Sequence, residues 1–256
     1  MAQLTFLGTG TSTGVPVMGC TCEACTSRDP RDTRLRCSAL YEDDSVRILL
    51  DCGPDFRYQI LRSGFFAPLD AVLLTHEHYD HVGGVDDLRP FCRYGNVPLY
   101  GDGRTCRSLR ERIPYCFAQN LYPGVPKITL DEVEPGSAFS VKGLRIMPLR
   151  IMHGKAPILG YRIGENLAYI TDMKTMPQEN YRLLEGVRVL VLNALRDKDH
   201  PTHQTIEEAL EVARRVGAEQ TYLIHMSHEA PVYEKMSDRM PEGVHVAYDG
   251  LRIQIP

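Results

Sequence analysis

Short apolar runs with the length of β-strands recur along the chain, and predicted helices fall between groups of them. The clearest helix pattern covers residues 206–217, where apolar side chains recur at helical spacing and Gly217 ends the pattern. A strand pair is predicted around a polar turn at Asp43 and Asp44. The predicted strands are residues 4–8, 38–43, 46–53, 71–75, 144–151, 158–164, 167–172, 187–195, 220–227 and 245–255.

No internal repeat, low-complexity segment or long charge run divides the 256-residue chain, and we expect a single domain over residues 1–256. Residues 95–126 are rich in proline, glycine and asparagine and are predicted to form an irregular insert, with a short helix around residues 104–111. Inserts of this kind often carry specificity, and a plain surface excursion explains the segment nearly as well.

Composition and charge argue against several classes of protein, including general nucleic-acid-binding and membrane proteins. Hydrophobic residues make up 43% and charged residues 24%, and the net charge of −4 predicts no general nucleic-acid-binding or anionic-membrane-binding surface. The longest apolar runs are far too short to span a membrane. The first residues, MAQLTFLGTG, lack the features of a signal peptide, so we expect a cytoplasmic location. In that reducing compartment the eight cysteines favour free thiols and metal ligands over disulfides.

The segment LLTHEHYDHVGG, residues 73–84, places four candidate metal ligands directly after a buried strand. His76 and His78 point the same way if the segment is extended, and a following helical turn would direct Asp80 and His81 to a second ion. Imidazole and carboxylate groups suit divalent ions such as zinc or manganese. Four ligands are more than one ion with an open position needs from a single loop. We therefore prefer a metal site to a histidine-rich turn without metal.

The pattern H-x-H-x-D-H after a strand resembles the signature of the metallo-β-lactamase fold. The resemblance implies an α+β protein, an αββα sandwich with a dinuclear metal site at the sheet edge. That pattern calls for three more ligands at strand ends, and the sequence supplies His153, Asp172 and His225 in the expected order. The resemblance implies one ion held by His76, His78 and His153, a second held by Asp80, His81 and His225, and Asp172 as the bridge.

Three cysteines within six residues, Cys20, Cys22 and Cys25, indicate either a redox pair or most of a metal site. His228 near the C-terminus is free to complete a closed Cys3His structural zinc site. No thioredoxin-like pattern surrounds the C-x-x-C pair, and unrelated thiols remain an alternative. GTG, GVP and GC-x-C-x-x-C followed by a late H-x-S-H resemble the PhnP-type phosphodiesterases. This resemblance implies such a zinc clip and the hydrolysis of cyclic phosphodiesters of ribose phosphates.

The predicted function is therefore a metal-dependent phosphodiesterase for a small cyclic ribose phosphate, of the phosphoribosyl 1,2-cyclic phosphate type. We expect two active-site cations, zinc or manganese, that share a hydroxide, and one structural zinc. The leaving alkoxide needs a general acid, and the spacing favours His203 over His200. Asp80 is expected to steer the nucleophile as well as to bind metal. Asn193 stands where the PhnP-like branch often has an aspartate, which leaves its role open.

Three alternatives are weighed against this function. An RNA-processing endonuclease of the same fold needs a basic surface, which this acidic chain does not show. Hydrolysis of a carbon ester or lactam suits the fold, but a lactamase would normally be exported. A non-enzymatic zinc-binding or redox-sensing module belongs to another class. We expect a small phosphodiester substrate, no stable nucleic-acid binding and no membrane partner, and related enzymes suggest a homodimer.

Overall fold

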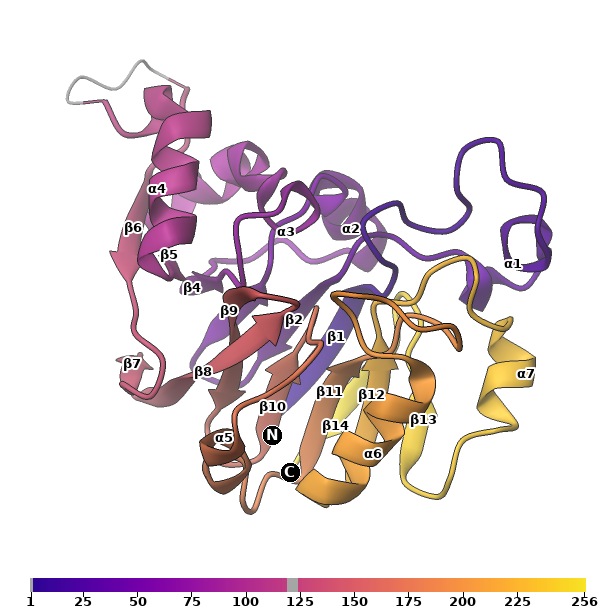
Figure 1. Ribbon diagram of the computed structural model, residues 1–256. Helices are drawn as coiled ribbons and strands as arrows, with labels where there is room; N and C mark the ends of the chain where they lie inside the picture. The colour runs from indigo at the N-terminus through magenta and orange to yellow at the C-terminus, as the bar shows by residue number, and fades with distance from the viewer. Residues whose placement is uncertain (1, 119–123) are drawn as a thin grey trace.

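Two β-sheets lie face to face at the centre of the computed structural model, which describes residues 2–118 and 124–256 (Figure 1). The first sheet has the order β14 (Arg252–Ile255), β1 (Ala2–Gly8), β2 (Ser38–Glu42), β3 (Arg47–Leu50), β4 (Ala71–Leu73), β5 (Val97–Gly101) and β6 (Ile128–Glu132). The second has the order β13 (Val244–Val246), β12 (Gln220–Ile224), β11 (Val189–Asn193), β10 (Leu167–Ile170), β9 (Ala156–Ile163), β8 (Leu144–His153) and β7 (Phe139–Val141).

Helices cover the outer faces of both sheets, so the expected αββα sandwich is confirmed (Figure 1). No helix among the described residues is long and apolar enough to cross a membrane. The α-helices are α1 (Glu23–Thr26), α2 (Phe56–Ser63), α3 (Tyr79–Val82), α4 (Gly103–Arg112), α5 (Gln178–Leu183), α6 (Ile206–Val216) and α7 (Tyr233–Ser237). The 3-10 helices are η1 (Pro30–Asp32), η2 (Val85–Tyr94) and η3 (Pro114–Cys116).

Helix α6 confirms the helix predicted from the apolar spacing. Thr205 and Glu208 form a capping box in which each side chain accepts a hydrogen bond from the other residue's backbone N–H. Gly217 ends the helix with a φ of 70°, a left-handed conformation that glycine adopts at little cost. Ile206 and Val212 are buried in the cluster that lies against the second sheet. This packing fixes the helix on that sheet.

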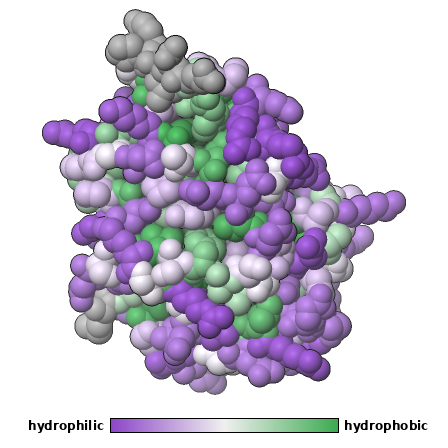
Figure 2. All heavy atoms as spheres, turned by 90° about the vertical axis from the view of Figure 1, so that its left-hand side faces the viewer, coloured by the Kyte–Doolittle hydropathy of each residue, from purple (hydrophilic) through white to green (hydrophobic). Residues whose placement is uncertain are grey.

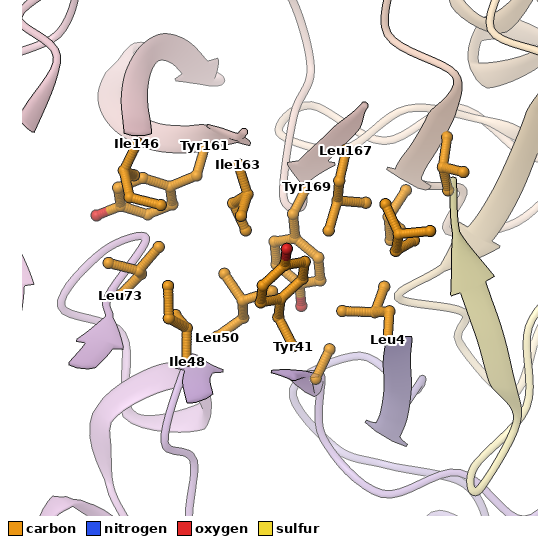
Figure 3. Close-up of a cluster of buried hydrophobic side chains, with 14 of the residues drawn as sticks. Leu4, Tyr41, Ile48, Leu50, Leu73, Ile146, Tyr161, Ile163, Leu167 and Tyr169 are labelled. Carbon is orange, nitrogen blue, oxygen red and sulfur yellow. The ribbon is translucent and has the colours of Figure 1, made fainter. Parts of the chain in front are cut away.

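The central core lies between the sheets, and successive side chains along a strand point alternately into this core and away from it. In β3 the side chains of Ile48 and Leu50 face the second sheet, whereas Leu49 belongs to the outer cluster under the helices. Figure 3 shows Ile48 and Leu50 opposite Tyr161 and Tyr169 of the second sheet. Because both faces of the sheet are covered, the strands read as nearly continuous apolar runs.

Removing a central side chain will lower the stability of the whole domain. Leu4 is fully buried in this core, so Leu4→Ala is expected to reduce the free energy of unfolding by about 2–5 kcal/mol, measured by urea denaturation. Leu61→Ala is the control, because the Leu61 side chain is 64% exposed and its truncation should change stability by less than about 0.5 kcal/mol. Equal losses in the two variants would contradict the assigned core.

The structure differs from the predicted strand over residues 245–255. That stretch forms two strands in different sheets, β13 and β14, because the chain turns at Gly250, whose φ is 91°. The backbone N–H of Gly250 donates to the carbonyl of Phe6 at 2.7 Å, which directs the chain back to the first sheet.

Much of the predicted irregular insert, residues 95–126, has regular structure. Val97–Gly101 form β5 inside the first sheet, with Val97 and Leu99 buried, and the short predicted helix is present as α4. Two buried residues in alternation suffice for a short strand even beside glycine and proline. Residues 119–123 of the predicted insert lie outside the described residues. Figure 2 shows the side of the molecule that carries α4 and β6, where hydrophilic side chains stand out and hydrophobic ones lie recessed.

Candidate metal centre

The structure gathers the predicted ligands at one edge of the sandwich, where strands of both sheets end (Figure 1). The loop from His76 to His81 follows β4, and α3 begins directly after His78, as the predicted helical turn required. His153 ends β8, Asp172 follows β10, and His225 follows β12.

Four of these side chains form one compact group. Asp80, His81, Asp172 and His225 offer ligand atoms that all lie within 4.8 Å of one another. Nε2 of His81 is 3.2 Å from both Asp80 Oδ2 and Asp172 Oδ2, and Nε2 of His225 is 3.2 Å from Asp172 Oδ1. The group brings together every ligand predicted for the second ion.

A second group shares Asp172 with the first. His153, Asp172 and His203 offer atoms within 4.8 Å of one another. Asp172 therefore has the position that a bridging carboxylate requires.

The other two predicted ligands of the first ion lie beside this second group. Nε2 of His76 and Nδ1 of His78 are 2.9 Å apart, and two nitrogens on one tetrahedral zinc would be about 3.3 Å apart. The ring centroids of His76 and His78 are 5.7 and 5.3 Å from that of His153. His76 is buried, whereas His78 is exposed.

Unpartnered buried nitrogens indicate what the site can hold. Nδ1 of His203 and Nδ1 of His225 are buried without a hydrogen-bond partner among the described residues, and Nε2 of His81 and Nε2 of His225 lie 3.2 Å from carboxylate oxygens without an aligned hydrogen bond. Nδ1 of His153 lies 2.8 and 3.0 Å from the carbonyls of Asp172 and Thr202, so it donates and leaves Nε2 free to bind. Leaving such atoms unpaired costs about 1–3 kcal/mol each, which a cation would offset. The imidazole nitrogens and carboxylate oxygens of the site are ligand atoms that suit divalent cations such as zinc or manganese.

Asp51 is a functional residue that the sequence reasoning did not single out. Its carboxylate lies 2.7 Å from Nδ1 of His81 and also accepts hydrogen bonds from the backbone N–H and hydroxyl of Thr75. Nδ1 of His81 therefore donates to Asp51, which turns Nε2 toward the site. The only sequence signal is its place near the end of the predicted strand over residues 46–53, since the candidate ligands His153, Asp172 and His225 also lie near strand ends.

The backbone at the site is held in unusual conformations. Asp51, Asp172 and His225 have φ values of 57°, 56° and 59°, in the left-handed region that costs about 1–3 kcal/mol for such residues. A Cβ on Gly53 would lie 2.0 Å from the carbonyl oxygen of Asp80, so only glycine lets the segment after Asp51 touch the metal loop. The surrounding fold imposes these conformations and directs the side chains to one point.

Inside the site, neighbouring opposite charges outweigh the effect of burial on the pKa values of the ionisable side chains. Burial opposes a charged His225, but the carboxylates of Asp172 and Asp80 outweigh it and raise the pKa of His225 to about 9. The same carboxylates hold the pKa of His81 well above its usual range despite burial. Burial acts to raise the pKa of Asp172, yet the imidazoles of His225 and His81 bring it well below its usual range. Cations that bind here would therefore displace protons from His81 and His225.

His203 and His200, the two candidate general acids, occupy different places. His203 is almost fully buried, and its Nδ1 lies 3.7 Å from Asp172 Oδ1. His200 lies farther out, with its ring centroid 5.0 Å from that of His203. Asn193 accepts from the backbone N–H of Met173 at 2.8 Å and donates to its carbonyl at 3.0 Å. Its role in the described structure is thus to hold the chain that follows Asp172.

The cysteine cluster forms a separate group. Cys20, Cys22, Cys25 and His228 offer ligand atoms within 4.8 Å of one another, and Nδ1 of His228 lies 3.2 Å from Cys20 Sγ and 3.5 Å from Cys22 Sγ. The backbone N–H of Cys25, more than any other contact, lowers the pKa of the Cys22 thiol to about 6, whereas burial raises that of Cys25 to about 11. One thiolate is thus present at neutral pH, and a zinc ion would favour the others.

Replacing one of these cysteines is expected to remove one zinc per chain. Cys22→Ser should lose that ion and lower the melting temperature, because a four-ligand clip joins segments about 200 residues apart. Inductively coupled plasma mass spectrometry and thermal unfolding measure both effects. Cys92→Ser is the control, since Cys92 lies outside the ligand groups found among the described residues. Unchanged zinc content in Cys22→Ser would refute the clip.

Comparison with known proteins places the chain in a family. Residues 46–226 match the Beta-lactamase superfamily domain. The chain therefore belongs to the β-lactamase superfamily, and its metallo-β-lactamase fold and ligand groups are those of a metal-dependent hydrolase.

Three proteins illustrate its relationships. A crystal structure described as "a New Diphosphatase from the PhnP Family" is 39% identical with a TM-score of 0.91, over 100% of this chain and 98% of that one. "Octanoyltransferase" of Porphyromonas gingivalis is 49% identical over 248 residues, 96% of this chain and 50% of that protein, so the chain spans half the length of this relative. "Ribonuclease Z" of Methanopyrus kandleri is 27% identical over 276 residues, 88% of this chain and 94% of that protein.

Proposed function

We propose that the protein is a metal-dependent phosphodiesterase that hydrolyses a small cyclic ribose phosphate, of the phosphoribosyl 1,2-cyclic phosphate type. The observation that carries the proposal is Asp172, which belongs to two adjacent ligand groups, with His203 in one of them. A bridging carboxylate between two cations suits in-line displacement at phosphorus. The likeness to the PhnP-family structure supports chemistry at phosphorus.

The side chains of the site have distinct roles in this reaction. When bound, two divalent cations, zinc or manganese, would lower the pKa of a water molecule and neutralise charge on the phosphoryl oxygens. His76, His78 and His153 would hold one ion, Asp80, His81 and His225 would hold the other, and Asp172 would contribute to both. Oδ2 of Asp80 lies 3.2 Å from Nε2 of His81, among the candidate ligand atoms. From there it can orient the attacking water.

His203 donates a proton to the leaving alkoxide. Burial and the neighbouring His225 lower the pKa of His203 to about 3, so its imidazole is neutral unless an opposite charge lies beside it. A phosphate anion beside the ring favours the imidazolium, because opposite charges stabilise each other in a buried site.

A diphosphate is the second candidate substrate, because the 39% identical PhnP-family protein is described as a diphosphatase. The same attack on phosphorus would cleave a P–O–P bond. Transfer-RNA cleavage is the remaining candidate within the fold, suggested by the ribonuclease Z relative. The acidic net charge of −4 disfavours it.

A substrate panel tests the proposal. Protein loaded with zinc or manganese is assayed on a ribose 1,2-cyclic phosphate, a nucleoside diphosphate and a precursor transfer RNA. The fourth substrate is p-nitrophenyl octanoate, included because one relative is named octanoyltransferase. The fastest turnover is expected on the cyclic phosphodiester, and removal of metal by a chelator should abolish it. Faster cleavage of the diphosphate would establish the second candidate, and hydrolysis of the octanoate ester alone would refute phosphoryl chemistry.

A further inference from the structure

Helix α4 contacts the metal-binding loop at the residue between its first two histidines. The carboxylate of Glu77 pairs with Arg104, with Nη2 of Arg104 2.5 Å from Oε1 of Glu77. At the other end of α4, Nη1 of Arg112 donates to the backbone carbonyl of Glu77 at 2.8 Å. Arg104 and Arg112 are eight residues apart, about 12 Å along a helix. Two guanidinium groups thus converge on a single residue of the loop.

We propose that α4 clamps the loop and sets its affinity for the ion that His76 and His78 bind, with Arg104 and Arg112 as positioning residues. The inference rests on the metal site of the proposed function. The inference assigns a role to α4, which contributes no residue to the ligand groups found in the described part of the chain.

The backbone geometry of the loop explains how the clamp reaches the ligands. The chain bends at Glu77, between His76 and His78, so contacts that hold both the side chain and the carbonyl of Glu77 fix the bend that carries the two histidines. The Arg112 contact acts on the peptide group that joins Glu77 to His78, and it therefore sets the orientation of that peptide plane. The Glu77 side chain is only 13% exposed, so its pairing is partly shielded from water.

Among the described residues, the His78 ring has no hydrogen-bonding partner outside the candidate ligands; the His225 ring has none either, but it is buried, whereas His78 is exposed. Asp51 orients His81, two backbone carbonyls orient His153, and Thr75 lies 3.0 Å from Nδ1 of His76. In the described residues the only hydrogen-bonding contact of the His78 ring is with His76, itself a ligand, and His78 is exposed. Groups that orient metal ligands commonly change metal affinity by about 10–100-fold when they are removed. The clamp supplies the orientation that His78 otherwise lacks.

The contacts of α4 also show why the effect should appear in metal binding and not in stability. The Arg104 side chain is 53% exposed, and ion pairs of such groups contribute little to folding. Arg110 lies on the same helix and forms a comparable pair with Glu132 at 3.2 Å, away from the loop. Arg110 is therefore the matched control.

The experiment compares zinc affinity among variants of the full chain. Metal-free wild type, Arg104→Ala, Arg112→Ala and Arg110→Ala are titrated with zinc against a chromophoric chelator, and thermal unfolding of the metal-free proteins is recorded. Arg104→Ala and Arg112→Ala should each weaken the weakest-bound zinc by about 10-fold, and Arg110→Ala should not. The three variants should unfold within a few degrees of wild type. Arg104→Lys should recover part of the affinity, because it keeps the charge.

A double substitution tests that the contact itself is responsible. Glu77→Ala combined with Arg104→Ala should weaken zinc no more than Arg104→Ala alone, because each change removes the same pair. Wild-type affinity in both arginine variants would overturn the clamp and leave the proposed function standing. A wild type that binds no zinc beyond the cysteine clip and cleaves no phosphoryl substrate would overturn the proposed function instead.

Discussion

Asp172→Asn is expected to reduce phosphodiester hydrolysis by well over 100-fold and to lower the metal content of the purified protein. Removal of a group that only orients a ligand costs up to about 100-fold, and Asp172 is shared by both ligand groups. Asparagine keeps the size of the side chain and tolerates the left-handed backbone, where φ is 56°. The fold should therefore survive, so the loss will report on the carboxylate.

Steady-state turnover and mass-spectrometric metal analysis measure this effect together. Asp131→Asn is the control, because Asp131 is exposed in β6, at the far edge of the first sheet. Full activity in Asp172→Asn with bound metal would show that Asp172 bridges nothing. Equal losses in both variants would point to a general effect of removing negative charge.

His203→Ala is expected to lower kcat by about 10²–10⁴-fold while both ions remain bound, as befits loss of a general acid. The effect should depend on the leaving group. An alkoxide must be protonated as it departs, whereas p-nitrophenolate leaves readily without a proton, so bis(p-nitrophenyl) phosphate should show a much smaller loss.

The control for this prediction is His200→Ala. His200 lies outside the group formed by His153, Asp172 and His203, and its removal should change kcat little. Loss of metal from His203→Ala would instead identify His203 as a ligand, and equal losses on both substrates would contradict proton donation.

Local sequence was sufficient for the metal loop and for α6. The spacing from His76 to His81 places four candidate ligands within six residues, so a bend at Glu77 and one helical turn are enough to direct them. The capping box and Gly217 likewise act within the helix that they bound. The later ligands depended on the family resemblance, because a lone histidine or aspartate at a strand end has no local meaning.

The support of these ligands was not predictable from the sequence. Asp51 meets His81 across 30 residues, and Asn193 meets Met173 across 20. These contacts arise because neighbouring strands end at the same edge of a sheet, which depends on strand order. The place of β5 inside the first sheet has the same cause, whereas residues 245–255 divide between two sheets at the turn of Gly250.

By itself, the sequence predicted the loop of candidate ligands, the cysteine cluster and the apolar runs of the strands, because these are properties of neighbouring residues. Only the tertiary structure decided that Asp172 belongs to both ligand groups, that His203 lies inside the site, and that α4 holds Glu77. Each of these depends on where distant segments meet, and that is set by the packing of two sheets and their helices.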